Sequence, residues 1–204
     1  MGKAEGELEG YTAYRISVEP MSLVGSLLCY RRDDYWEGGA HPSGAIGYDH
    51  VDAARPGKTL KLTDLFPDAT VRDALWNDKI VRKVLTDAGV TTKPATSKAL
   101  AEKLKFKTFS DKEGEIEYGF NPDLLSEFSF HHLEGDKVAV RLCVPWGAEV
   151  YRFQYTEIGL LLPIPARLRA PLRAAAAGRS GFLGREAKRR FKDRETSLFD
   201  TEEK

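Results

Sequence analysis

Histidine and carboxylate side chains carry most of the chemistry that this sequence could support. His41 and His50 flank a predicted hairpin, and Asp49 is next to the second of them. A histidine beside a carboxylate is the smallest unit that can act as a general base. The sequence contains no G-x-S-x-G turn, no H-E-x-x-H motif and no glycine-rich phosphate loop. Hydrolysis through His41 and Asp49 is therefore one hypothesis among several.

The other two histidines, His131 and His132, are adjacent in a predicted strand. Neighbouring side chains of a strand point to opposite faces, so we expect that these imidazoles do not bind one metal ion together. Cys29 and Cys143 lack the spacing of a zinc motif. They form one disulfide if their strands are neighbours, or they remain free buried thiols. The sequence thus predicts no metal site and no cofactor.

A short segment with the sequence YWEGGAH combines two aromatic residues, two glycines and a histidine. Gly38 and Gly39 allow a tight turn and the close approach of a ligand to the backbone. Large rigid rings bury much area at low entropic cost, so Tyr35, Trp36 and His41 suit contacts with a protein or a carbohydrate. We expect these five residues to form a ligand-binding site at a hairpin tip. If the rings fold back over the sheet, they belong to the core instead.

The strands that hold this segment are predicted from apolar and β-branched runs. Residues 11–18 and 22–30 read as two strands with a turn at Glu19-Pro20 between them. A return strand over residues 45–51 follows the glycine pair. The segment is therefore expected at the end of a hairpin.

One long helix and one short helix follow the first hairpin. Thr70 and Asp73 resemble a capping box, and Gly89 is a suitable end for the helix that they open. The apolar residues between them recur every third or fourth position, which is typical of a helix that packs on a core. A second, shorter helix is predicted over residues 97–105.

A second hairpin is predicted nearer the C-terminus. Phe128 and Phe130 alternate in one strand, the sequence LEGDK forms a turn, and residues 138–144 form the next strand. Strands, then helices, then strands predict an α+β fold. We expect an antiparallel sheet of hairpins packed against one long and one short helix.

The last part of the chain differs in charge from the rest. The whole chain has 31 basic and 31 acidic residues, so no overall charge draws it to nucleic acid, and no nucleic-acid partner is expected. Residues 166–194 contain ten basic residues and two acidic ones. We predict a domain over residues 11–172 and a basic, partly helical or disordered tail over residues 173–204. The tail is a solvated segment or a contact for an anionic surface.

The order of these motifs resembles the RsiV/PdaC C-terminal-like domain family, a family of domains of unknown function. The segments that carry the resemblance are Tyr35–His41 and Gly57–Phe66, the second with the sequence GKTLKLTDLF. The resemblance covers about residues 11–172. It implies an α+β domain outside the cytoplasmic membrane that recognises a lysozyme-like protein or a cell-wall glycan and leaves the catalysis to other domains.

These observations lead to three hypotheses of function. The first is a non-catalytic ligand-binding or sensing module of the cell envelope, in a periplasmic or extracellular location, with a membrane anchor in some longer form of the protein. The second is an immunity or inhibitor protein against a wall-degrading hydrolase. The third is a peptidoglycan-modifying hydrolase that uses His41 and Asp49. The longest apolar run, residues 158–165, is too short to span a bilayer.

Overall fold

The computed structural model describes most of the chain. The described residues are 2–6, 11–38, 43–111, 114–119, 125–144, 147–148, 154–178, 181–183 and 194–197. Their side chains are described for residues 13–37, 44–104, 125–142, 157–178 and 181–183.

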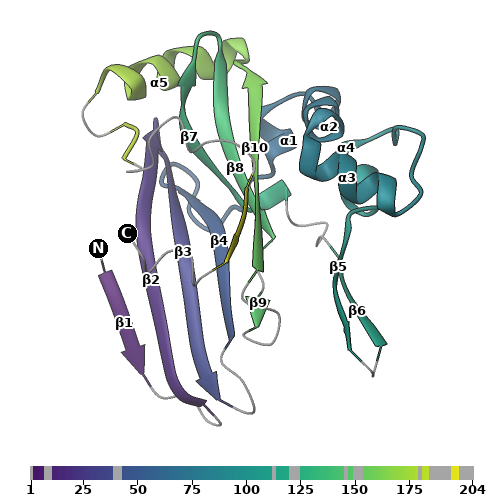
Figure 1. Ribbon diagram of the computed structural model, residues 1–204. Coiled ribbons are helices and arrows are strands. Elements are labelled where there is room, and N and C mark those ends of the chain that lie inside the picture. Colours follow the sequence, from purple (N-terminus) through teal and green to yellow (C-terminus); the bar gives the residue numbers. More distant parts are fainter. Residues whose placement is uncertain are drawn as a thin grey trace.

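Two antiparallel sheets and a separate hairpin contain the described strands (Figure 1). The five-stranded sheet has the order β1-β2-β3-β4-β9, and the four-stranded sheet has the order β11-β10-β8-β7. The strands are β1 (Gly2–Gly6), β2 (Tyr11–Val24), β3 (Leu27–Gly38), β4 (Ser43–Asp52), β5 (Lys105–Asp111), β6 (Gly114–Gly119), β7 (Phe128–Glu134), β8 (Lys137–Val144), β9 (Gly147–Ala148), β10 (Gln154–Pro163) and β11 (Arg194–Ser197). Among the described strands, β5 pairs only with β6.

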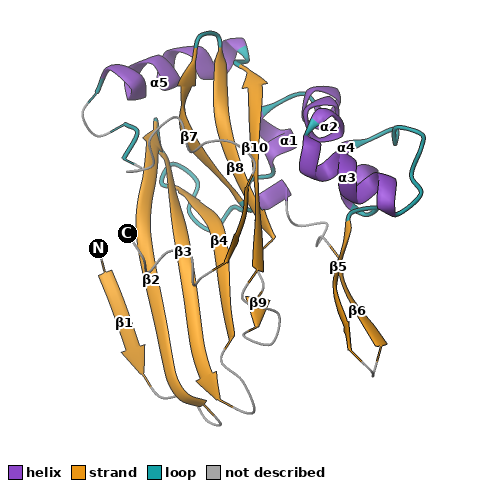
Figure 2. Cartoon of the chain, viewed as in Figure 1, coloured by secondary structure: helices purple, strands orange, loops and turns teal. Residues whose placement is uncertain are grey.

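The described helices gather on one side and across one end of the sheets (Figure 2). They are α1 (Leu62–Leu65), α2 (Asp68–Asn77), α3 (Lys79–Asp87), α4 (Ser97–Ala101) and α5 (Ala166–Ala177). The predicted α+β class, with antiparallel hairpins packed on helices, is confirmed. The four-stranded sheet is the middle layer, because β7 contacts β2, β3 and β4 while β10 contacts α2.

The predicted single long helix is wrong, because Asp78 divides it into α2 and α3. The Asp78 side chain accepts hydrogen bonds from the backbone N–H groups of Ile80 and Val81, both at 2.9 Å. It therefore caps α3, and its own extended backbone interrupts the helix. The predicted capping box of Thr70 and Asp73 is also wrong. α2 already begins at Asp68, with no side-chain cap.

The predicted turn at Glu19-Pro20 is wrong as well. β2 continues through both residues and reaches Val24, and the chain reverses at Gly25, which has a φ of 61°. Proline has no N–H to donate to a strand ladder, and a bulge between Pro20 and Ser22 accommodates it. The predicted hairpin after it is confirmed, since β3 pairs with β4 from Leu27 to Trp36.

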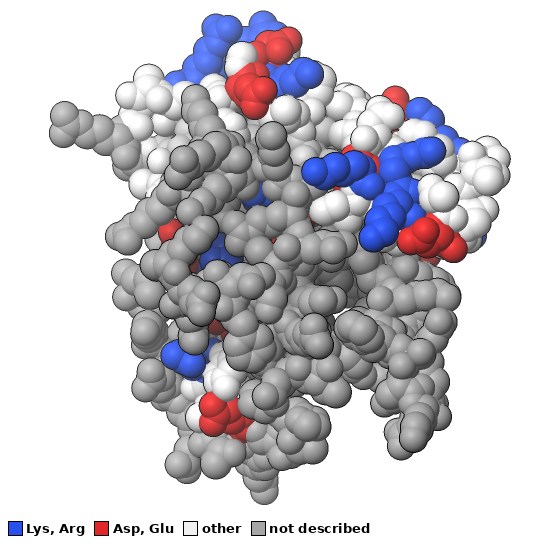
Figure 3. Space-filling view, viewed as in Figure 1, with Lys and Arg blue, Asp and Glu red and all other residues white. Residues whose placement is uncertain are grey.

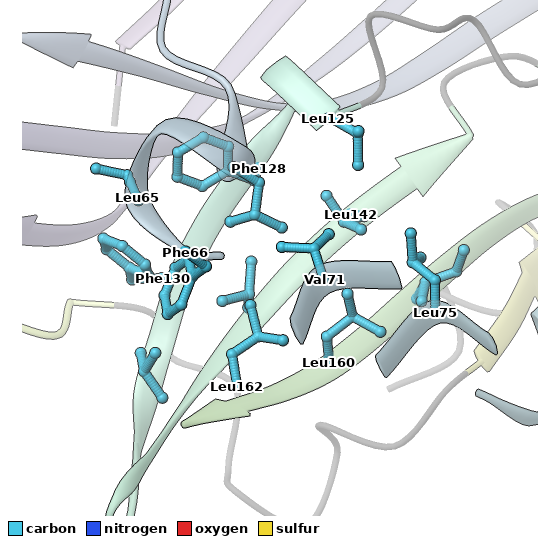
Figure 4. Close-up of a cluster of buried hydrophobic side chains, with 14 of the residues drawn as sticks. Leu65, Phe66, Val71, Leu75, Leu125, Phe128, Phe130, Leu142, Leu160 and Leu162 are labelled. Atoms are coloured by element: carbon cyan, nitrogen blue, oxygen red, sulfur yellow. The ribbon is translucent and has the colours of Figure 1, made fainter. Parts of the chain in front are cut away.

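The main core lies between the four-stranded sheet and helices α1 and α2. Side chains alternate in direction along β7, β8 and β10. The apolar side chains of these strands pair with one another across the sheet and therefore share one face. Burying one such side chain is worth about 1.5–3 kcal/mol relative to leaving it exposed. The cluster includes Leu65, Phe66, Val71, Leu75, Phe128, Phe130, Leu142, Leu160 and Leu162 (Figure 4). The alternation predicted for Phe128 and Phe130 is thus confirmed.

The described parts of the predicted tail lie against the rest of the fold. α5 begins at Ala166, so the predicted boundary at residue 172 falls inside this helix. Ala175 is buried, Phe182 packs against the core, and the Leu183 N–H donates to the Met21 carbonyl at 2.8 Å. β11 pairs with β10. In Figure 3, basic and acidic residues lie side by side at the upper end, over α5 and the β7–β8 turn.

Candidate functional site

The structure places three of the five predicted site residues along β3. Tyr35 and Trp36 precede Gly38, which is the last residue of the strand. Gly39 and His41 lie outside the described residues. Tyr35 and Trp36 are adjacent in a strand and therefore point to opposite faces of the five-stranded sheet. The face toward the four-stranded sheet is called the inner face below, and the opposite face is called the outer face.

Tyr35 lies on the inner face near the end of the hairpin. Its hydroxyl donates a hydrogen bond to Glu37 Oε1 at 2.7 Å, and the Arg15 guanidinium carbon lies 5.2 Å from the centre of its ring. The half-buried ring packs against a small cluster formed by Met21, Ile46 and Tyr48. The ring therefore contacts the core and stays partly exposed, and its role as a ligand contact stays a prediction.

Trp36 lies on the outer face and is half-buried. Its strand partners are Tyr14 on β2 and Ser43 on β4, so two aromatic residues stand side by side. Every second residue of β3 shares this face, which adds Arg32 and Tyr30 to the same row. Arg32 and Tyr30 do not stand out in the sequence, because the strand register is needed to place them beside Trp36.

An ion network holds Arg32 on the outer face. Arg32 Nε donates to Asp34 Oδ2 at 2.9 Å, and Arg32 Nη1 lies 3.2 Å from Asp49 Oδ2. Burial lowers the pKa of Arg32, but Asp49 and Asp34 outweigh it and raise the pKa. Gly47 is the strand partner of Arg32 on β4 and is buried, and a Cβ at Gly47 would lie 3.9 Å from Arg32 Nη2, so the guanidinium lies over this glycine. Burial and Asp49 raise the pKa of Tyr30, the next residue of the row.

A polar layer is buried between the two sheets, on the inner face. The Tyr48 hydroxyl donates to Glu157 Oε1 at 2.6 Å. Arg141 is fully buried, and Glu157 is 1% exposed. Burial raises the pKa of Asp33, with a further contribution from Glu157, although Arg31 lies 3.0 Å from it and opposes the shift. The burial of Arg141 is not visible in the sequence, where arginine usually indicates an exposed position.

The predicted pair of Asp49 with a histidine is not assembled at His50. Asp49 lies on the outer face with Arg32, whereas His50 lies on the inner face. His50 Nε2 accepts a hydrogen bond from the Leu60 N–H at 3.2 Å, and its ring centre lies 4.5 Å from that of Phe128. Burial lowers the pKa of His50, although Asp49 raises it in part. His50 is therefore a neutral residue that supports the chain at Leu60.

The expectation that His131 and His132 point to opposite faces is wrong. A bulge in β7 between Phe130 and His132 changes the alternation. Their Nδ1 atoms lie 2.7 Å apart, and both residues are buried, with 5% and 7% exposure. Among the described residues, no group of three or more histidine, cysteine, aspartate or glutamate residues could hold a metal ion.

Cys29 is a free thiol on the inner face. It is fully buried beside the hydroxyls of Ser22 and Ser129. Burial raises its pKa to about 11, although hydrogen bonds with these hydroxyls oppose the shift. A thiol with this pKa is inert at neutral pH. The side chain of Cys143, its predicted disulfide partner, lies outside the described residues.

We compared the chain with protein-family models, with curated proteins and with solved structures, and none of them matches it. No helix among the described residues is long and apolar enough to cross a membrane. The resemblance to the RsiV/PdaC C-terminal-like domains therefore stays a prediction, which rests on the sequence segments alone.

Proposed function

We propose that the chain is a non-catalytic binding or sensing module of the cell envelope. Its ligand is a wall-related protein or glycan, and its location is periplasmic or extracellular. The observation that supports this function is the placement of Tyr35 and Trp36, two half-buried rings near the end of the β3–β4 hairpin. Rings held by a sheet lose little conformational freedom on binding, which favours their use as contact residues.

The described residues favour binding over the hydrolase hypothesis. Asp49, one of the two residues named for catalysis, is paired with Arg32 at 3.2 Å. His50, the other histidine near it, uses Nε2 to accept the Leu60 N–H. A general base needs a free lone pair and a carboxylate that orients the ring. Neither group has this arrangement in the structure.

Binding to two probes tests the proposed function. Purified peptidoglycan sacculi are sedimented with the chain, and an immobilised muramidase is used to capture it. We expect binding to at least one probe, and we expect Trp36→Ala and Tyr35→Ala to weaken it by about fivefold or more. Val51→Ala, at the other end of β4, is the control and leaves binding unchanged. If neither probe binds, or if both ring variants bind like the original chain, the proposed function is wrong.

Turnover assays separate the proposal from its two alternatives. An inhibitor would stop the muramidase at a one-to-one ratio, whereas a sensing module leaves its turnover unchanged. A hydrolase would release fragments from labelled sacculi and would lose this activity in His41→Ala. We expect neither result. Fractionation of cells that express the full-length gene tests the location, and recovery in the cytoplasm would contradict it.

A further inference from the structure

The outer face of β3 carries a row of side chains that the hairpin tip does not include. Tyr30, Arg32, Asp34 and Trp36 occupy every second position of this strand and therefore share one face. Tyr30 to Trp36 spans about 20 Å at the usual rise of a strand. The row has an aromatic residue at each end and a fixed guanidinium between them. It is long enough for several linked units of an extended ligand.

The Arg32 side chain is accessible at the centre of the row. On β4 its partner is Gly47, and on β2 its partner is Val18. The guanidinium is oriented by Asp34 and Asp49 through Nε and Nη1, and its side chain is 44% exposed. Arginine has five N–H donors, so donors remain for the hydroxyl or amide oxygens of a ligand. Neutral ligands with many oxygens fit this site.

The charge of the row argues against an anionic ligand. One arginine stands beside two carboxylates, Asp34 and Asp49, so the ion network has an excess of one negative charge when all three are ionised. Phosphate polymers and nucleic acids are repelled by such a surface. An uncharged ligand with apolar ring faces and polar edges matches both the aromatic residues and the central donors.

We infer that the outer face of β3 binds an uncharged saccharide chain, with its sugar rings packed on Tyr30 and Trp36 and its oxygens bonded to Arg32. This inference rests on the proposed function, since a wall glycan is one of the two ligand classes named there. To the proposed function it adds which face of the sheet binds the ligand, the chemical class of that ligand and the role of Arg32. The glycan lies along β3, over the row.

Calorimetric titration with penta-N-acetyl-chitopentaose, called chitopentaose below, tests the inference, because this saccharide is soluble and uncharged. We expect binding to the original chain and about tenfold weaker binding to Tyr30→Ala and to Arg32→Ala. Arg82→Ala is the matched control, because this exposed arginine also lies over an aromatic ring, that of Trp76 at 4.4 Å. The control variant should bind like the original chain. Melting curves of all three variants confirm that they fold.

The outcomes separate this inference from the proposed function. The inference is wrong if chitopentaose gives no heat of binding, or if Tyr30→Ala and Arg32→Ala bind it normally. It is also wrong if polyphosphate, an anionic probe, binds and loses its affinity in Arg32→Ala. If sacculi or a muramidase still bind in a manner that depends on Trp36, the proposed function stands although the saccharide inference is wrong. If those probes fail too, both are wrong.

Discussion

The two faces of the five-stranded sheet share the same strands but differ in their surroundings. On the inner face, Tyr48 donates to a carboxylate that is 1% exposed, and Arg141 of the facing sheet is fully buried. On the outer face, Arg32 is 44% exposed and pairs with Asp34 beside solvent. The period of two in a strand is sufficient to separate these environments. We therefore expect stability to depend mainly on the inner-face residues, and we propose that the alternate, outer-face residues bind the saccharide.

The difference in burial decides how much each charged group contributes to the free energy of unfolding. A buried charge must be paired, because the loss of its partner leaves an ion in a medium of low polarity. An exposed pair is screened by water and contributes little. Residues of the same type on the two faces should thus respond very differently to the same substitution.

The two arginines give the largest expected contrast. Arg141 and Glu157 lie on the same face of neighbouring strands, since Arg141 pairs with Gly159 and Glu157 with Cys143. Arg141→Ala should lower the free energy of unfolding by about 3–5 kcal/mol. Arg32→Ala should lower it by less than about 1 kcal/mol. Urea denaturation of both variants measures the contrast, and equal losses would contradict it.

Two tyrosines provide a milder contrast without a change in ring size. Tyr48→Phe removes the donor to Glu157 Oε1 and should cost about 1.5–3 kcal/mol, because a hydrogen bond to a charged group is lost. Tyr30→Phe on the outer face should change the free energy of unfolding by no more than about 0.5 kcal/mol. Thermal unfolding of the pair checks this, and a large loss in Tyr30→Phe would show that the outer face is buried.

The pH dependence of stability reports on His50. Its folded pKa lies below the ordinary value of 6.5 because of burial. Between the two pKa values the unfolded state binds more protons, so stability falls as the pH drops from about 7 to about 5. His50→Gln keeps an acceptor for Leu60 and should reduce this fall. Urea denaturation at both pH values is the measurement, and an unchanged fall would contradict the neutral, buried state.

The smallest effect is expected at Val51 on the outer face. Val51 is 48% exposed and has exposed partners across β3 and β2, Leu28 and Leu23. Val51→Thr keeps a β-branched side chain and should change the free energy of unfolding by less than about 0.5 kcal/mol. A larger loss in urea denaturation would mean that this row packs against another part of the molecule.

Alternation was sufficient to predict the hairpins of this fold but not their irregularities. The alternation predicted for Phe128 and Phe130 is correct because both side chains pack on the same apolar core. The break at Asp78 was missed because the helical pattern continues on both sides of a residue that caps the second helix. The contact between His131 and His132 was missed because a bulge depends on the neighbouring strand.

The same limit applies to the candidate site. Tyr35 and Trp36 stood out by type and by the glycines that follow them, but their faces were not assigned. Tyr30 and Arg32 became candidates only when the register of β3 with β4 placed them opposite Asp49 and Gly47. Single residues were thus visible in the sequence, whereas the surface that they form was not.

The central claim is that the outer face of β3 binds the saccharide chain and that the polar layer buried on the inner face serves stability. Nuclear magnetic resonance spectra during titration with chitopentaose test it most directly. We predict that the Trp36 indole N–H and the Arg32 Nε–H signals shift, while the methyl signals of Met21 and Ile46 stay in place. Shifts confined to Met21 and Ile46, or no shift at all, would contradict the claim.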